Sequence, residues 1–214
     1  MSIRSGKKGG KRTVRDRARI EQFEYAQTFL IVCEGERTEP NYFRSFRVAG
    51  DVRKIDIQGT GYNTLSLVNW AIELQAEEDY DQVWCVFDRD SFPAETFNAA
   101  LTLARQHGIR LAYSNEAFEL WYLLHYHFFN TAMSRHRYCQ KLTGLLKREY
   151  KKNDPFIYQE LLERQGDAIR NARRLLAEYN PPNPAQDNPS TTVHLLVEAL
   201  NRYAPENLRR PAGK

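Results

Sequence analysis

Carboxylate side chains follow two apolar runs of this sequence, in positions that suit metal-dependent phosphate chemistry. The runs are Phe29–Cys33 and Val83–Phe87, and the tripeptides that follow them are Glu34-Gly35-Glu36 and Asp88-Arg89-Asp90. Short apolar runs bounded by turn residues are typical of buried parallel strands, and ligands of an open α/β sheet bind outside the carboxyl ends of its strands. If the two strands are neighbours, Glu34, Asp88 and Asp90 meet in one crevice. Three hard oxygen ligands there favour Mg²⁺ or Mn²⁺.

The Asp-x-Asp spacing supports a shared metal ion. Side chains two residues apart leave a strand on the same face, whereas consecutive side chains leave it on opposite faces. Asp88 and Asp90 can therefore hold one ion together, while Arg89 points elsewhere or toward a phosphate. The alternative is structural, because acids at strand ends also serve as turn formers and helix caps.

Two glutamates compete for the catalytic position after the first strand. Gly35 between them permits a tight turn from strand to helix. Spacing does not decide between the two. We favour Glu34 because it directly continues the strand, and Glu36 either binds a second metal ion or caps the following helix.

The helix after this turn is expected to offer a phosphate site at its N-terminus. It opens at Glu39-Pro40, with Thr38 as the N-cap and proline in the first turn. The unpaired N–H groups and the positive dipole end of such a helix favour a phosphate, and the Arg37 guanidinium is a second donor beside it.

A third acidic segment follows the fourth expected strand. Glu119 lies in a nearly apolar helix, and a lone buried carboxylate needs a partner or a metal ion. The alternative is a salt bridge to an arginine on a neighbouring helix. Glu116 is expected to complement the helix N-terminus. His125 and His127 have a spacing that does not suit a metal site, so His125 is interpreted as a core histidine.

The pattern of strands and helices predicts an α/β fold. Strands are expected at residues 28–33, 52–57, 82–87 and 109–113, separated by helices at 39–50, 65–77 and 93–108. This alternation predicts a parallel sheet of about four strands with helices on both faces. After Asn115 no strand is expected, and helices are predicted at 117–129, 135–150, 154–165 and 167–179, followed by one from a Ser190 cap to 203. The predicted divisions are a basic tail (1–24), an α/β core (25–130) and a helical C-terminal subdomain (131–214).

Charge and cysteine usage narrow the class of protein. Residues 1–19 carry a net charge of +7 and the remainder −3, so the positive charge lies in a Gly/Lys/Arg-rich tail that we expect to be disordered. This tail either attracts phosphates nonspecifically or acts as a solubilising leader. Three cysteines, two of them in expected strands, argue against a disulfide framework and favour a cytoplasmic protein. No apolar run is long enough for a membrane span.

The sequence resembles the RloB family, whose members are placed with Toprim-type folds. The resemblance covers residues from about 28 to 203 and rests on four segments: Ile-Val-Cys-Glu-Gly-Glu-Arg-Thr-Glu-Pro-Asn-Tyr-Phe (31–43), Phe-Asp-Arg-Asp (87–90), Ser-Asn-Glu-Ala-Phe-Glu-Leu-Trp (114–121) and Asn-Pro-Ser-Thr-Thr-Val (188–193). It implies that Glu34 matches the Toprim glutamate and that Asp88 and Asp90 match the Toprim Asp-x-Asp, which hold Mg²⁺ for phosphodiester transfer. Glu119 is not part of that pattern.

The same resemblance implies a role in bacterial restriction or anti-phage defence, beside an ABC-type ATPase that holds similar effectors inactive. The first hypothesis is therefore a nuclease acting on DNA or RNA, with tRNA among the substrates to test, in which Glu34, Asp88 and Asp90 bind Mg²⁺ or Mn²⁺ and Glu119 is a further catalytic candidate. Arg37 and Arg89 would stabilise developing charge.

Two other hypotheses remain open at this point. One is a sensor or interaction module of the same fold that no longer cuts and works through a partner ATPase, which the slightly acidic charge outside the tail favours. The other is a phosphotransferase of the haloacid dehalogenase type with Asp88 as nucleophile. A stable aspartyl-phosphate would distinguish that enzyme, but its Asp-x-Asp usually follows the first strand.

Overall fold

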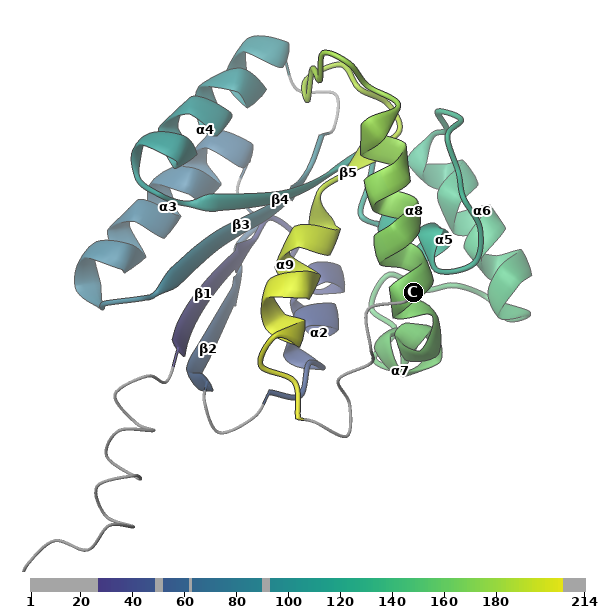
Figure 1. Cartoon of the computed structure of the whole chain (residues 1–214), viewed down its shortest axis with the longest axis horizontal. Helices are drawn as coiled ribbons and strands as arrows, with labels where there is room; N and C mark the ends of the chain where they lie inside the picture. The colour runs from purple at the N-terminus through teal and green to yellow at the C-terminus, as the bar shows by residue number, and fades with distance from the viewer. Residues whose placement is uncertain (1–26, 49–51, 62, 90–92, 206–214) are drawn as a thin grey trace, which may run out of the picture.

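The protein is an α/β structure whose sheet is covered by helices on both faces (Figure 1). The computed structural model describes residues 27–48, 52–61, 63–89 and 93–205. The predicted basic tail and Asp90 lie outside the described residues. Within the described ranges the sheet has five strands in the order β2-β1-β3-β4-β5, and only β5 is antiparallel to its neighbour. The predicted fold class is confirmed, with one strand more than the sequence indicated.

The first half of the chain alternates strands and helices as predicted. Its elements are β1 (Gln27–Cys33), α2 (Thr38–Arg44), β2 (Val52–Gly59), α3 (Thr64–Glu77), β3 (Gln82–Asp88), α4 (Ala94–Gln106) and β4 (Arg110–Asn115). Each connection between parallel strands passes through a helix, as parallel pairing requires. One cap differs from the prediction: Thr38 is the first helical residue, and its hydroxyl donates to the Lys152 carbonyl (2.7 Å) instead of capping α2.

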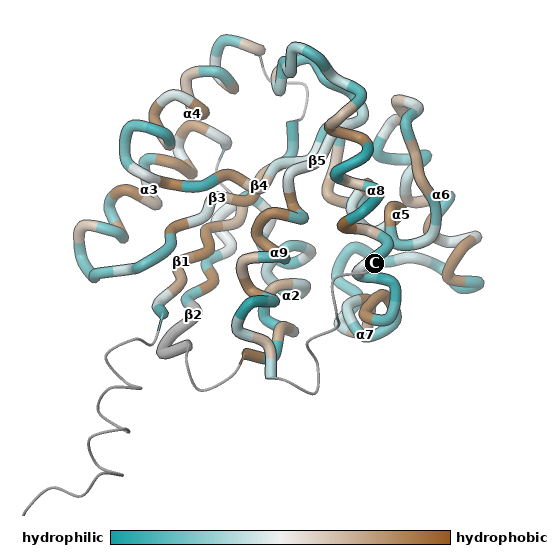
Figure 2. Tube along the Cα trace, viewed as in Figure 1, coloured by the Kyte–Doolittle hydropathy of each residue, from teal (hydrophilic) through white to brown (hydrophobic). Residues whose placement is uncertain are grey.

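Alternation along the strands divides the apolar core into two layers. From β1, Phe29 and Ile31 belong to the layer that contains α2, α5, α8 and α9, whereas Leu30 and Val32 belong to the layer under α3 and α4. Figure 1 shows α3 and α4 together on one side of the sheet, and Figure 2 shows apolar residues along β1 and β3. Strands with apolar side chains on both faces are those of a sheet buried between helical layers.

The second half of the chain is helical except for a short strand. It contains α5 (Glu119–Leu124), α6 (Arg135–Leu146), α7 (Ile157–Leu161), a 3₁₀ turn (Leu162–Arg164), α8 (Gln165–Ala177), β5 (Ser190–Thr191) and α9 (Val193–Asn201). None of the helices in the described part of the chain is long and apolar enough to traverse a bilayer. The division into a core and a C-terminal subdomain stays a prediction.

The prediction that no strand follows Asn115 was wrong, as was the Ser190 cap. β5 pairs with β4, with Ser114 opposite Thr191, and the two hydroxyl oxygens of this pair lie 2.9 Å apart in the buried interior. The Ser190 hydroxyl donates to the Asp187 carbonyl (2.8 Å), and α9 begins after Thr192. A two-residue strand held by hydroxyl groups has no apolar alternation, which is the signal that predicts strands.

The predicted helix at 117–129 is shorter than expected but fully buried. All six residues of α5 are buried, as its apolar composition indicated. The helix stops because the Asn171 side chain donates to the Leu124 carbonyl (2.8 Å) and the next N–H groups turn back to carbonyls three residues earlier. His125 at this end is a core histidine, with Nδ1 donating to the Trp121 carbonyl (2.9 Å), and burial lowers its pKa to about 4.

Candidate active site

The acids of the first and third strands meet where the direction of strand connection reverses. β1 pairs with β2 on one side and with β3 on the other. The connection through α2 packs on one face and that through α3 on the other. This is a topological switch point, at which open α/β sheets form their ligand crevice. The cleft there has a volume of about 460 Å³ and is lined by Glu34, Gly35, Glu36, Arg37, Thr38, Glu39, Asp88, Phe118, Glu119, Arg135, Lys152 and Asn153.

Glu34 sits on the β1 end and reaches across to β3. Its backbone N–H donates to the Val86 carbonyl (2.8 Å), which extends the ladder by one residue, and its carboxylate Oε2 accepts the Asp88 N–H (3.0 Å). The Gly61 N–H donates to the Glu34 carbonyl (2.8 Å) from the segment that follows β2. Glu34 is thus held from both sides, and its half-buried carboxylate lies directly beside Asp88.

Asp88 has one paired and one unpaired carboxylate oxygen. Oδ2 forms an ion pair with Arg135 Nη2 at 2.9 Å, whereas Oδ1 is buried and accepts no hydrogen bond from the described residues. Burial raises the pKa of Asp88 well above its ordinary value. The negative charges of Glu39 and Glu119 raise this pKa further, and Arg135 opposes them. Asp88 Oδ1 is therefore a carboxylate oxygen that could bind a cation or accept a hydrogen bond.

Glu39 is a further acid of the cleft that the sequence interpretation missed. Only 5% of it is exposed, and its Oε2 has no hydrogen-bond partner in the described part of the chain. The carboxylate packs against Gly35, where an added Cβ would lie 2.0 Å from that oxygen. Burial raises the pKa of Glu39 to about 7, with further contributions from the charges of Glu119 and Glu34. Its signal was helical spacing: Glu39 stands three and four residues before the buried Tyr42 and Phe43.

Glu119 is buried below the cleft and is hydrogen-bonded to a phenol. It is 2% exposed, and the Tyr150 hydroxyl donates to its Oε1 (3.2 Å). Burial raises the pKa of Tyr150, and the charge of Glu119 raises it further, so this phenol stays a proton donor. The salt bridge that the sequence left as an alternative is replaced here by a hydrogen bond from a tyrosine.

The remaining candidates lie at the rim of the cleft or away from it. Glu36 and Arg37 are exposed at the rim, and an added Cβ at Gly61 would approach Glu36 Oε1 to 3.2 Å. Arg89 does not line the cleft. Its Nε donates to the Ala185 carbonyl (3.0 Å) and its guanidinium lies 5.1 Å from the Phe97 ring centroid, because successive strand residues point to opposite faces.

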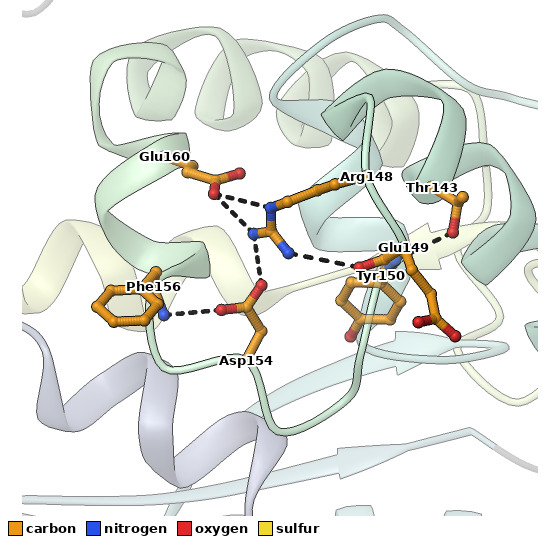
Figure 3. Close-up of polar contacts among 7 residues, drawn as sticks. All are labelled: Thr143, Arg148, Glu149, Tyr150, Asp154, Phe156 and Glu160. Atoms are coloured by element: carbon orange, nitrogen blue, oxygen red, sulfur yellow. Dashed lines mark hydrogen bonds and ion pairs between the residues drawn. The ribbon is translucent and has the colours of Figure 1, made fainter.

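Two cations of the cleft come from the second half of the chain. Arg135 begins α6, and Lys152 lies in the segment between α6 and α7. Figure 3 shows how this segment is held: Arg148 forms ion pairs with Asp154 (2.5 Å) and Glu160 (2.7 Å). No local sequence signal pointed to either cation, since their approach to the strand ends depends on how the helices pack.

The donor set of the cleft suits a hard divalent cation. Glu34, Asp88 and Glu39 present carboxylate oxygens, and two of these oxygens are buried without a hydrogen bond from the described residues. Among the residues described, no three acidic, histidine or cysteine side chains already converge as a ligand set. Asp88 is turned toward Arg135, and Asp90 is not described.

The comparison with family models decides the family. The model of the RloB-like protein family matches residues 29–200. The chain belongs to this family. The match spans most of β1 through most of α9 and includes every acid of the cleft, so the predicted resemblance to RloB proteins is confirmed. Neither the curated proteins nor the solved structures provide a match for this RloB-like protein.

Proposed function

We propose that this RloB-like protein is a Mg²⁺- or Mn²⁺-dependent nuclease that hydrolyses phosphodiester bonds in DNA or RNA. The observation that carries the proposal is the contact between the Glu34 carboxylate and the Asp88 backbone at the switch point of the sheet. The acids of a nuclease centre must converge in a cleft that is open to substrate, and these two do. The family resemblance supports the same assignment of Glu34 and Asp88.

The charge of the cleft supports a requirement for a cation. Among its described lining residues are five acids and three basic side chains. A nucleic-acid phosphate approaching so many carboxylates is repelled unless positive charge is added. Two of the acids have raised pKa values because burial and mutual repulsion disfavour their charged forms. A divalent cation would relieve this repulsion and attract the substrate.

Each group in the cleft has a distinct part in the proposed reaction. A bound Mg²⁺ ion supplies polarisation of the scissile phosphate and a lowered pKa of the attacking water. Glu34 and Asp88 would hold the ion, and Asp90 is a third candidate ligand. Arg135 and Lys152 face the same cleft and can bind phosphate oxygens. Glu119 lines the cleft, and the hydrogen bond from Tyr150 fixes the position of its carboxylate.

The proposal is tested by cleavage of plasmid DNA, single-stranded DNA and total tRNA with Mg²⁺, Mn²⁺ or a chelator. We expect metal-dependent cleavage by the wild type and none by Glu34→Gln or Asp88→Asn, with circular dichroism spectra unchanged. Glu77→Gln is the matched control, because Glu77 is exposed at the far end of α3. Cleavage that persists in both site variants contradicts the proposal.

A non-cleaving interaction module is the second candidate, and one observation favours it. The Arg135 guanidinium forms an ion pair with Asp88, so this acid can serve the structure of the cleft without performing chemistry. Within either proposal the protein acts in bacterial anti-phage defence with an ABC-type ATPase partner, as the family resemblance implies. The cleavage assay is therefore repeated with the co-expressed ATPase. No cleavage with or without this partner favours the interaction module.

A further inference from the structure

Arg135 connects the helical second half of the chain to the end of β3. Its backbone N–H donates to Glu116 Oε1 (3.3 Å), and its guanidinium pairs with Asp88 Oδ2 (2.9 Å). The side chain of Arg135 is 34% exposed, whereas that of Asp88 is 14% exposed. The more exposed cation thus covers a mostly buried acid from the solvent side of the cleft.

We propose that Arg135 is a displaceable counter-ion, which neutralises Asp88 in the metal-free protein and binds a substrate phosphate once a divalent cation takes its place. The proposal rests on the nuclease function proposed above. Arg135 and a metal ion would compete for the same carboxylate. A guanidinium stays charged at any accessible pH, so a metal ion on the Asp88 carboxylate would repel Arg135, which lies 2.9 Å from Oδ2.

A released guanidinium would find a phosphate of the substrate within the same cleft. Arg135 and the exposed Lys152 line the same cleft from two different elements. The Lys152 backbone is fixed to α2 by the Thr38 hydroxyl. A planar guanidinium matches phosphate oxygens in a two-pronged geometry, and a lysine beside it adds a point charge. Arg135 therefore exchanges one anion for another within the cleft.

The start of α6 does not depend on this ion pair. The Arg135 side chain is 34% exposed, so solvent screens its attraction to Asp88. The helix start itself is held by the Glu116 contact to the backbone N–H, which does not need the arginine side chain. The guanidinium can therefore move without loss of α6.

The test compares Mn²⁺ binding by the full chain with and without the Arg135 charge. Free Mn²⁺ is measured by electron paramagnetic resonance during titration, without nucleic acid. Arg135→Gln is expected to bind Mn²⁺ about tenfold more tightly than the wild type, since a neighbouring opposite charge typically shifts a carboxylate by 1–3 pKa units. Arg137→Gln is the matched control, with the same charge change at an exposed site two residues further along α6.

A second measurement reports the phosphate contact. With Ca²⁺ in place of Mg²⁺, both Arg135→Gln and Lys152→Gln should bind a single-stranded oligonucleotide more weakly, and each should lower the salt slope of binding by about one. Equal Mn²⁺ affinity of wild type and Arg135→Gln, in a protein that binds Mn²⁺ and cleaves, overturns this inference alone. Absence of Mn²⁺ binding in both proteins overturns the inference together with the nuclease function.

Discussion

Replacing Glu39 by glutamine is expected to stabilise the protein at neutral and alkaline pH but not in acid. Glutamine has nearly the same shape and carries no charge. The carboxylate of Glu39 is 5% exposed, and its Oε2 has no hydrogen bond from the described residues. Ionising it in the folded protein is therefore unfavourable, and the substitution removes that cost.

The size and direction of the effect follow from the shifted pKa. The unfolded chain loses the Glu39 proton near pH 4.5, and the folded protein keeps it until about pH 7. Between these values the folded state binds more protons, so the stability of the wild type falls as the pH rises. A shift of this size corresponds to about 3 kcal/mol at pH values above the folded pKa. The Glu39→Gln variant does not lose this stability, because glutamine has no proton to release.

The assay is urea denaturation followed by tryptophan fluorescence, in chelator, from about pH 4 to about pH 8.5. The free-energy difference between Glu39→Gln and wild type should grow across this range and then level off. Glu36→Gln is the control, because Glu36 is exposed at the rim of the same cleft and its charge is already solvated. A difference that stays constant with pH would refute the argument that Glu39 takes up a proton on folding.

Two further substitutions test the packing of the site, and a third, outside the site, is the control for one of them. Gly35→Ala should destabilise the protein by about 1–3 kcal/mol, since the new Cβ would overlap the Glu39 carboxylate. Gly144→Ala in α6 is the control: nothing lies within 4 Å of the added Cβ, so this substitution should stabilise the protein by about 0.5–1 kcal/mol. Thermal denaturation measures both changes. Tyr150→Phe should cost about 1–3 kcal/mol in urea denaturation, because Glu119 then lacks its phenolic donor. An unchanged midpoint for Tyr150→Phe would mean that another group satisfies Glu119.

The sequence was sufficient to place Glu34 and Asp88 because their position depends on local rules. Each follows an apolar run, and parallel strands bring their carboxyl ends to one edge of the sheet. The neighbouring pairing of β1 and β3 then made the two acids meet. Glu119 was recognised as a special position by a similar rule, since a carboxylate in a wholly apolar helix needs a partner.

The rest of the cleft depended on information that local patterns do not carry. Glu39 was interpreted only as a helix opener, although its spacing from Tyr42 places it on the buried face. Arg135 and Lys152 also line the cleft but are distant in sequence from β1 and β3. Tertiary packing, which local patterns do not predict, decides which helix lies at the cleft. β5 was not predicted, because its two residues pair with β4 through hydroxyl groups and show no apolar alternation. The role of Asp90 remains a prediction, since Asp90 lies outside the described residues.

β5 comes late in the sequence, and this affects both the folding of the protein during synthesis and the design of truncated versions. The Tyr113 backbone N–H donates to the Thr192 hydroxyl across 79 residues of sequence. Until that stretch has left the ribosome, the outer edge of β4 has no partner, and a bare strand edge invites association with other chains. Fragments that stop before residue 190 should therefore be prone to aggregation. A shortened recombinant version for crystallography needs to retain β5 and α9.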